Sequence, residues 1–560
     1  MARVLIFHGY LLAGTGSNVY NARLARALAR LGHDVHLLCQ ERHPELLEFV
    51  DAAGDWDSGA LEVRRLRETG GSAAGTGAAA GGAAAGTGAA ASTGAAASGG
   101  ADDPAGSAEG GSCTVYRPDI GGLLPVYVAD RYEAIEARTF AECSDEELAR
   151  YLRANVEAVA EVAARVEPEL ALANHLVMGP VILARALAGT PYAVKVHGSA
   201  LEYTVKPEPE RFLGLAREGL ARAAAVLVGS RHTAESLWQA IADPGLARRT
   251  RLGPPGVDVG RFRPLEYDAA MAGVAALAGA LERAPAPDPG VQQSAFASDP
   301  RGAGAALARV GEGDLLVTFV GKLIVSKGPD LLLAAFPLVL ERVPRARLVV
   351  VGFGAFREGL EAIAGALQAG DLERVAELAR AGRELEGAVT AEPLTYLLEF
   401  LESLHGPSAE RYLAAARSLS ERVLFTGRLE HEELTDLLPA CSAMVVPSTF
   451  PEAFGMVAAE AAACGALPIS AAHSGLAEVT HALAAGVPQE IRPLLSFELG
   501  PGAVEGIATR LLAWLQSEPA VQERTRAGLV ETVRARWSWE SVAESVIAAA
   551  RGELGGLPEA

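Results

Sequence analysis

Glu452 and Glu460 stand eight residues apart in the segment 447–460, which follows an apolar run and enters an alanine-rich stretch. Glu452 lies just before the predicted helix, where a carboxylate either accepts hydrogen bonds from ligand hydroxyls or complements the helix dipole. Glu460 lies inside that helix among small apolar residues, and an unpaired carboxylate in such surroundings would be costly. Its surroundings therefore favour a carboxylate that holds the two hydroxyls of a ligand over a plain surface charge.

The residues between the two glutamates predict an anion site. Phe454, Gly455, Met456 and Val457 place consecutive backbone N–H groups at the expected start of the helix. The first N–H groups of a helix lack intrahelical partners and carry a partial positive charge, which suits a phosphate.

Two lysines lie in the loop that follows another apolar run. Lys322 and Lys327 occur in the segment 319–328, after the expected strand at 315–320. Cations at this place would neutralise a diphosphate, and they would favour a transition state in which a leaving diphosphate gains negative charge. Taken alone, the two lysines are slightly more typical of solvated loop charges.

A glycine-rich loop near the start of the chain offers a second phosphate site. The segment 9–17 contains Gly14 and Gly16 and runs into an expected helix at 18–31, so its N–H groups face outward at a helix start. A dinucleotide fingerprint would need a third glycine where Val19 stands, although Glu41 lies where a ribose-binding acid would be expected. Two alternatives stay open for this loop. It could be a tight turn that binds no ligand, or it could be the dinucleotide site of a dehydrogenase.

These groups need a scaffold that brings distant loops together, and the apolar pattern predicts one. Short apolar runs alternate with helical patterns, which indicates parallel sheets built from βαβ units. The first series of runs lies at 4–7, 35–38, 170–172, 192–196 and 225–228, and the second at 315–320, 347–351, 423–425 and 443–446. In such α/β sheets ligands bind beyond the carboxyl ends of the strands, where the loops described above are expected.

The pattern divides the chain into two domains with two insertions. We expect an amino-terminal domain at 1–264, a linker with a partly helical start at 265–314, a second domain at 315–535, and a final helix at 536–560 that crosses back. Within the first domain, residues 69–112 are almost entirely Ala, Gly, Ser and Thr, which predicts a disordered insertion. Within the second, residues 355–421 predict an additional helical module longer than the connection requires.

Composition limits the classes of partner and the compartment. A chain of 560 residues is too long for a single hydrophobic core. Its net charge of -20 disfavours nucleic acid as a partner. A local basic face would still allow peripheral contact with a membrane. The five cysteines show no paired spacing, which indicates reduced thiols rather than disulfides or a zinc site. With neither a secretory leader nor an apolar stretch long enough for a transmembrane segment, we expect a cytoplasmic protein.

Taken together, these motifs resemble the retaining glycosyltransferases of family 4, which have the GT-B fold. The resemblance rests on the Glu452 and Glu460 pair, the two-lysine loop and the opening glycine loop, with further matches at 195–199, 255–264 and 474–478. It covers nearly the whole chain outside the two insertions and the linker. It implies an α/β protein with two Rossmann-like domains that face each other across a cleft, the second of which binds most of the donor.

The resemblance also implies individual roles. His197, Lys327 and Glu452 would be catalytic, with His197 lining the cleft near the donor sugar and Glu452 binding that sugar. Glu460 would bind the ribose. The donor-binding set would comprise Gly14, Gly16, Lys322, Lys327, Gly427, Arg428, Leu429, Glu452, Phe454, Gly455, Met456, Val457 and Glu460, with residues 427–429 bordering the base. Lys322 stands where the family usually has arginine, which keeps the charge but loses the bidentate fork, and Ala453 replaces a common glycine.

The resemblance further implies partners and a reaction. The donor would be a nucleotide diphosphate-sugar, the acceptor an unidentified sugar, lipid or small molecule, and no metal or other cofactor would be required. Transfer would retain the anomeric configuration without a protein nucleophile. Two alternatives stay open, namely a nucleotide-sugar epimerase or phosphorylase on the same scaffold, and a nucleotide-sugar-binding protein without turnover.

Overall fold

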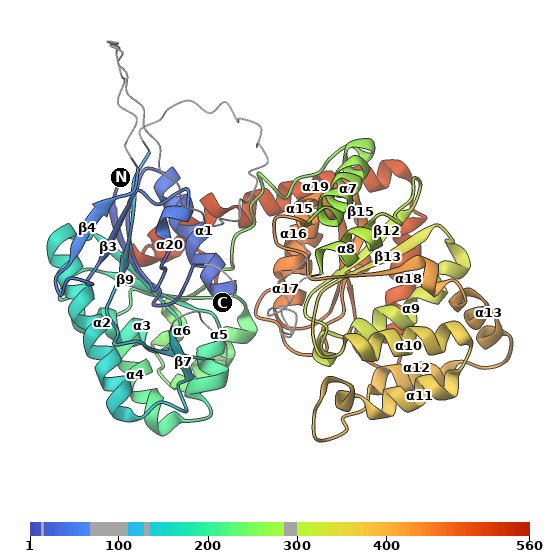
Figure 1. The fold of residues 1–560 in the computed structure, drawn as a ribbon, viewed down its shortest axis with the longest axis horizontal. Helices are drawn as coiled ribbons and strands as arrows, with labels where there is room; N and C mark the ends of the chain where they lie inside the picture. Colours follow the sequence, from blue (N-terminus) through green and yellow to red (C-terminus); the bar gives the residue numbers. More distant parts are fainter. Residues whose placement is uncertain (13–15, 68–109, 128–134, 285–298) are drawn as a thin grey trace, which may run out of the picture.

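The chain folds into two lobes that lie side by side (Figure 1). The computed structural model describes residues 1–12, 16–67, 110–127, 135–284 and 299–560. Most of the predicted insertion at 69–112 therefore lies outside the described residues. Its end was placed too far along the chain, because Gly111 donates its N–H to the carbonyl of Ala29 at 2.9 Å, and the carbonyl of Ser112 accepts from Val35 at 2.8 Å.

The first lobe contains a nine-stranded sheet in the order β11-β10-β9-β8-β1-β2-β5-β3-β4. All neighbouring strands are parallel except β3 and β4. The strands are β1 (Arg3–Phe7), β2 (Asp34–Leu38), β3 (Ala52–Asp55), β4 (Glu62–Arg65), β5 (Cys113–Arg117), β8 (Leu170–Asn174), β9 (Tyr192–Val196), β10 (Ala225–Val228) and β11 (Thr250–Leu252). The central strands are apolar on both faces, as expected for a parallel sheet covered by helices on each side.

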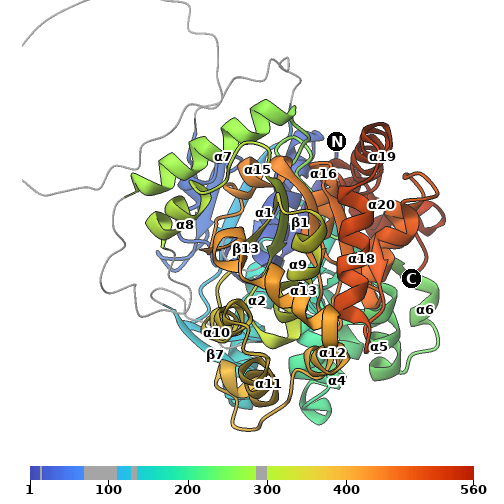
Figure 2. The ribbon, with the colours of Figure 1, turned by 90° about the vertical axis from the view of Figure 1, so that its right-hand side faces the viewer.

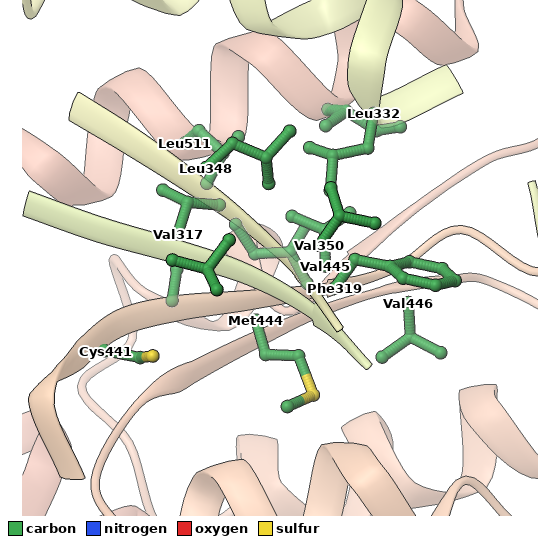
Figure 3. Packing of buried hydrophobic residues seen from close by; sticks show 14 of the residues in the cluster. Val317, Phe319, Leu332, Leu348, Val350, Cys441, Met444, Val445, Val446 and Leu511 are labelled. Carbon is green, nitrogen blue, oxygen red and sulfur yellow. The ribbon is translucent and has the colours of Figure 1, made fainter. Parts of the chain in front are cut away.

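The second lobe contains a six-stranded sheet, entirely parallel, in the order β14-β13-β12-β15-β16-β17. Its strands are β12 (Leu315–Val320), β13 (Ala346–Val351), β14 (Val423–Gly427), β15 (Cys441–Val446), β16 (Leu467–Ala471) and β17 (Ser496–Phe497). Figure 3 shows Leu332 and Leu511 packed on one side of these strands near Leu348, whereas Met444 points to the other side.

Each sheet has a topological switch point. β1 lies between β2 and β8, and β12 lies between β13 and β15. In each sheet the strands that come next in the chain lie on one side of this first strand, and later strands lie on its other side. Such a switch leaves a crevice at the carboxyl ends of the two central strands, where ligands bind in open α/β sheets. The loops predicted to carry chemistry follow β1, β12 and β15, so the topology places them at these two crevices.

Helices cover the faces of both sheets (Figures 1 and 2). No helix within the described ranges combines the length and the apolarity needed to cross a membrane. In the first lobe the helices are α1 (Gly16–Arg30), α2 (Asp145–Val166), α3 (Gly179–Ala186), α4 (Pro209–Ala221), α5 (Arg231–Ile241) and α6 (Leu246–Arg249). The second lobe includes α9 (Pro329–Arg342), α16 (Met456–Ala463), α17 (Ser474–Ala484), α18 (Ala503–Leu515) and α19 (Pro519–Trp537).

The predicted linker at 265–314 contributes to the second lobe. It contains α7 (Tyr267–Glu282) and α8 (Pro300–Leu307), which pack against each other, and α8 also packs against β14. Val274, Leu277 and Leu307 belong to the core of that lobe. The partly helical start expected here corresponds to α7, whereas the packing of both helices into the core of the second lobe was not predicted.

The helical segment at 355–421 is also part of the second lobe's core. It forms α10 (Arg357–Ala369), α11 (Leu372–Ala381), α12 (Thr395–Ser403), α13 (Gly406–Ala416) and α14 (Leu419–Arg422). α13 packs on α9, where Tyr412 is fully buried and its hydroxyl donates to the carbonyl of Ala334 at 3.0 Å. The segment is thus helical, as expected, and it packs on the helical layer of the sheet.

The end of the chain returns to the first lobe. α19 packs on the second lobe and ends at Trp537, and α20 (Trp539–Arg551) packs on α1, β8 and β9. Ser538 caps α20 by accepting from the N–H of Ser541 at 3.2 Å. At the crossing, the N–H of Val257 donates to the carbonyl of Trp537 at 2.6 Å, so the two connections between the lobes run side by side.

Candidate active site

The switch point of the second lobe brings two of the predicted loops into contact. The loop after β12 and the loop after β15 are joined by a hydrogen bond from the N–H of Thr449 to the carbonyl of Ser326 at 2.9 Å. Gly328 has a φ of +64°, and a Cβ there would lie 2.1 Å from the carbonyl oxygen of Pro447. Only glycine allows the two loops to approach this closely.

Lys327 and Glu452 form an ion pair across these loops. Oε1 of Glu452 accepts from the Lys327 ammonium and from the hydroxyl of Ser448, the latter at 2.7 Å. No residue in the described part of the chain donates to Oε2 of Glu452. Lys322 is exposed and makes no contact with this pair. The structure therefore brings Lys327 and Glu452 together and leaves Lys322 at the edge of the loop.

The predicted anion site lies at the start of α16. Gly455 has a φ of +117° and caps the helix, which begins at Met456, and a Cβ at Gly455 would lie 2.7 Å from the side chain of Leu476. Phe454 is buried and packs edge-on against Trp537 with the ring centroids 5.3 Å apart. The half-buried Met456 and Val457 follow in the first turn, where backbone N–H groups lack helical partners.

Glu460 is buried in α16, and its partner is a histidine that the sequence did not reveal. The side chain of Glu460 is 4% exposed, and its Oε1 lies 2.7 Å from Nε2 of His431. Burial lowers the pKa of His431, but the hydrogen bond to Glu460 and the charge of that carboxylate outweigh burial and raise it above its usual value. The His431 ring also packs on Phe262, with the centroids 4.9 Å apart.

The loop expected to border a nucleotide base lies at the end of β14. Gly427 has a φ of +74°, and its carbonyl accepts from the N–H of Gly352 at 2.9 Å. Arg428 pairs with Glu430 at 3.0 Å and lies over the ring of Phe353, 5.7 Å from its centroid. Leu429 is buried. The aromatic ring and the guanidinium offer flat surfaces at this edge of the crevice.

The crevice of the first lobe contains a chain of hydrogen bonds that ends at His197. Asn174 donates from Nδ2 to the Oδ1 of Asn21 at 2.7 Å, and its own Oδ1 lies 2.9 Å from Nε2 of His197. Nδ2 of Asn21 lies 3.0 Å from Nδ1 of His8. Gly16 is the first residue of α1 beside this chain, whereas Gly14 lies outside the described residues.

The direction of these hydrogen bonds assigns the proton positions on both histidines. Because the amide of Asn174 donates to Asn21, its carbonyl oxygen is the acceptor for the N–H at Nε2 of His197. In the same way Nδ1 of His8 accepts from Asn21. Burial lowers the pKa of His8 to about 4, and burial together with His175, Lys195 and His8 lowers that of His197 well below its usual value. Both rings are therefore neutral at physiological pH.

His175 lies next to this chain and was not predicted from the sequence. It is 2% exposed, and neither ring nitrogen has a hydrogen-bond partner among the described residues. Its ring centroid lies 4.9 Å from that of His197 and 4.6 Å from that of Tyr127. Burial holds the pKa of His175 well below its usual value. A lone histidine after a strand carries no sequence signal that distinguishes this position from an ordinary core residue.

The two lobes touch at the starts of α5 and α17 and beside the Glu452 loop. The N–H of Arg231, at the start of α5, donates to Oε1 of Glu478 in α17 at 2.6 Å. A Cβ at Gly229 would lie 2.8 Å from the carbonyl oxygen of Ala453. A cavity of about 270 Å³ opens between these contacts. It is lined by His232 of the first lobe and by Thr449, Pro451, Ala472, His473, Ser474, Glu498 and Leu499 of the second.

Two family models match the chain. The model described as Glycosyl transferase 4-like domain matches residues 15–253, and the one described as Glycosyl transferases group 1 matches residues 405–488. The first match corresponds to the lobe that contains His197. The second contains the Gly427 loop, Glu452 and Glu460.

Similar proteins of known sequence and structure agree with these matches. A D-inositol 3-phosphate glycosyltransferase of Frankia alni is 28% identical over 435 residues, which cover 75% of this chain and 84% of the relative. One of Kribbella flavida is 29% identical over 266 residues, and that match spans 47% of this chain and half of the relative's length. A glycosyltransferase of Rickettsia africae superposes with a TM-score of 0.53 at 12% identity over 99% of both chains. The Anabaena protein HepE in complex with UDP superposes with a TM-score of 0.50 at 15% identity, over 99% of this chain and 100% of HepE.

Proposed function

We propose that this chain is a family 4 glycosyltransferase, as its similarity to the two family models supports, and that it transfers a sugar from a nucleotide diphosphate-sugar to an acceptor with retention of the anomeric configuration. The observation that carries the proposal is the cluster of Lys327, Ser448 and Glu452 at the switch point between β12 and β15. The cluster sits directly before the start of α16, so a cation, a carboxylate and free backbone N–H groups occur in one crevice.

The donor would be held along α16. Glu460 would bind the ribose hydroxyls, and the amides of residues 454–457 would contact the diphosphate with help from Lys327 and Lys322. Glu452 would bind the transferred sugar, since its Oε2 has no donor within the described residues. A lysine ammonium has three donors, so Lys327 can keep its bond to Glu452 while it binds a phosphate oxygen.

The proposed chemistry is electrostatic. As the bond between the sugar and the diphosphate breaks, negative charge grows on the leaving oxygen, and Lys327 and the helix N-terminus would stabilise it. The acceptor would attack the face from which the diphosphate leaves, and no side chain is assigned as a nucleophile. His197 is neutral, so it would contribute a hydrogen bond instead of a charge to the donor sugar.

We assign no metal ion or other cofactor to this reaction, because cationic groups are already present in the crevice. Transfer that continues in excess EDTA is the expected result. A cytoplasmic setting is also part of the proposal, since the five cysteines are buried free thiols.

A thermal-shift panel followed by a transfer assay tests the proposal. UDP-glucose, GDP-mannose and ADP-glucose are compared with the free diphosphates, and one base is expected to stabilise the protein. The stabilising donor is then incubated with candidate acceptors, starting with D-inositol 3-phosphate because the Frankia relative is named for it. A product with the donor's anomeric configuration supports the proposal, whereas epimerised donor, phosphorolysis or binding without turnover would favour the alternatives.

A further inference from the structure

The loop that carries Glu452 is held from the side by the start of α17. The N–H of Glu452 donates to the hydroxyl oxygen of Ser474 at 2.8 Å. The carbonyl of Glu452 accepts from the N–H of Gly475 at 2.9 Å. Both polar groups of the Glu452 backbone therefore end on one neighbouring turn, 22 residues further along the chain.

His473 fixes the hydroxyl of Ser474. Nε2 of His473 lies 2.7 Å from the carbonyl oxygen of Ser448, and a carbonyl only accepts, so this nitrogen carries the proton. Nδ1, the other ring nitrogen, lies 3.0 Å from Oγ of Ser474 and can accept from its hydroxyl. Ser474 therefore donates its proton to His473, which leaves a lone pair of Oγ for the N–H of Glu452.

These contacts form a closed ring around Glu452. Ser448 accepts from His473 through its carbonyl and donates to Oε1 of Glu452 through its hydroxyl at 2.7 Å. The path continues from His473 through Ser474 to the backbone of Glu452. The ring fixes the backbone and the carboxylate of one residue together, and it directs Oε2 away from the bonds already made.

The turn that provides this support has an unusual backbone. Ser474 has a φ of +49°, in the left-handed region that residues other than glycine seldom occupy. At Gly475 a Cβ would lie 2.6 Å from backbone atoms of Phe454, so the turn is pressed directly against the Glu452 loop. Uncommon backbone conformations of this kind are retained where the surrounding structure requires them, often at functional sites.

We propose that His473 and Ser474 are positioning residues for Glu452, which they hold so that its free oxygen meets a hydroxyl of the transferred sugar. This inference rests on the proposed function, in which Glu452 binds that sugar. It assigns a task to the start of the 474–478 motif that the donor-binding residues leave unexplained. Neither residue needs to touch the donor for this task.

Ser474→Gly is the decisive variant, because it removes the hydroxyl but suits the left-handed backbone. With UDP-glucose, GDP-mannose and ADP-glucose as probes, we expect turnover of the accepted donor to fall roughly 10- to 100-fold, as for a misplaced catalytic group. Affinity for the matching free diphosphate should stay at the wild-type value, and the Tm should not fall. If Ser474 only stabilised the fold, Ser474→Gly would lower the Tm and leave turnover at the wild-type value.

Two further variants complete the test. Ala242→Gly relieves a similar left-handed residue, with a φ of +55° at the end of α5, and should leave turnover unchanged. His473→Gln can keep a donor for Ser448 at the position of Nε2 but has no acceptor at the position of Nδ1, so it should reproduce the defect of Ser474→Gly. The double variant should be no worse than either single one, because the two residues act as one unit.

The outcomes separate this inference from the function on which it rests. Glu452→Gln serves as the reference for a lost sugar contact. If the wild type shows neither turnover nor sugar-dependent affinity with any probe, the proposed function fails and the inference fails with it. If the wild type is active, Glu452→Gln is impaired and Ser474→Gly equals the wild type, the positioning role alone is overturned. Additive losses in the double variant would also overturn it.

Discussion

Replacing Glu460 by glutamine removes a negative charge from the buried side chain in α16 while keeping its volume. The carboxylate is 4% exposed and has His431 as its partner at 2.7 Å. Glutamine retains one oxygen that accepts from His431, so we expect the local fold to persist. What the variant loses is a charged acceptor for one of the two ribose hydroxyls that the proposed function assigns to it.

The loss of binding free energy follows from replacing a charged hydrogen-bond acceptor by a neutral one. A hydrogen bond to a charged group contributes about 1.5–3 kcal/mol. The dissociation constant should therefore rise roughly 10- to 150-fold, since each 1.4 kcal/mol corresponds to a factor of ten. Because the ribose occurs in the free diphosphate and in the intact donor alike, the affinities for both ligands should fall by the same factor.

Isothermal titration calorimetry with the two ligands measures this directly. Glu452→Gln is the matched control, because it should weaken binding of the intact donor while leaving the free diphosphate at the wild-type affinity. Wild-type affinity of Glu460→Gln for the free diphosphate would refute the ribose assignment. A loss confined to the intact donor would instead place Glu460 at the sugar.

Three other perturbations address the remaining parts of the site. Lys327→Met should lower kcat roughly 100- to 1,000-fold, as expected for a lost group that stabilises developing charge, and steady-state kinetics with unchanged activity would exclude that role. The raised pKa of His431 means that its pairing with Glu460 stabilises the fold below pH 6.5 and that this stabilisation is lost as the pH rises through the raised value. The Tm difference between the wild type and Glu460→Gln should accordingly be larger at pH 6 than at pH 9, and a constant difference would contradict it. Gly229→Ala would bring a methyl group within 2.8 Å of the carbonyl oxygen of Ala453, so it should lower turnover and increase the radius of gyration in X-ray scattering without lowering the Tm.

The sequence predicted the groups that meet at the second crevice because each follows an apolar strand. The strands at 315–320 and 443–446 place Lys327 and Glu452 at the carboxyl edge of a parallel sheet, whatever the order of strands. Their direct contact depends on β12 and β15 being neighbours, and that order is a property of the whole sheet. The family resemblance implied that both residues bind the donor, but neither it nor the periodicity gave the order of the strands.

The partners of the predicted residues were not foreseeable in the same way. His431 and His473 lie 29 and 21 residues from the glutamates that they support, and only His473 stands next to a predicted motif, at 474–478. A histidine in a polar loop is compatible with many surroundings, and only the folded geometry selects one. Helix α7 corresponds to the helical start expected within 265–314, whereas α8 and the packing of both helices on the second lobe were not predicted.

The paired crossing between the lobes has a mechanical consequence. Val257 and Trp537 are hydrogen-bonded at 2.6 Å, and Val257 forms a bridge with Ser538, so both passages of the chain meet at a single place. Two lobes joined by one narrow pair of chain segments are expected to move relative to each other as about a hinge, because such a pair bends more easily than its segments slide past each other. A change of angle at Val257 alters the separation of the two lobes, including the contact between Gly229 and Ala453. The bending stiffness of this short ribbon, which lies beside the start of α16 through the contact of Trp537 with Phe454, is therefore expected to limit how far the two lobes separate.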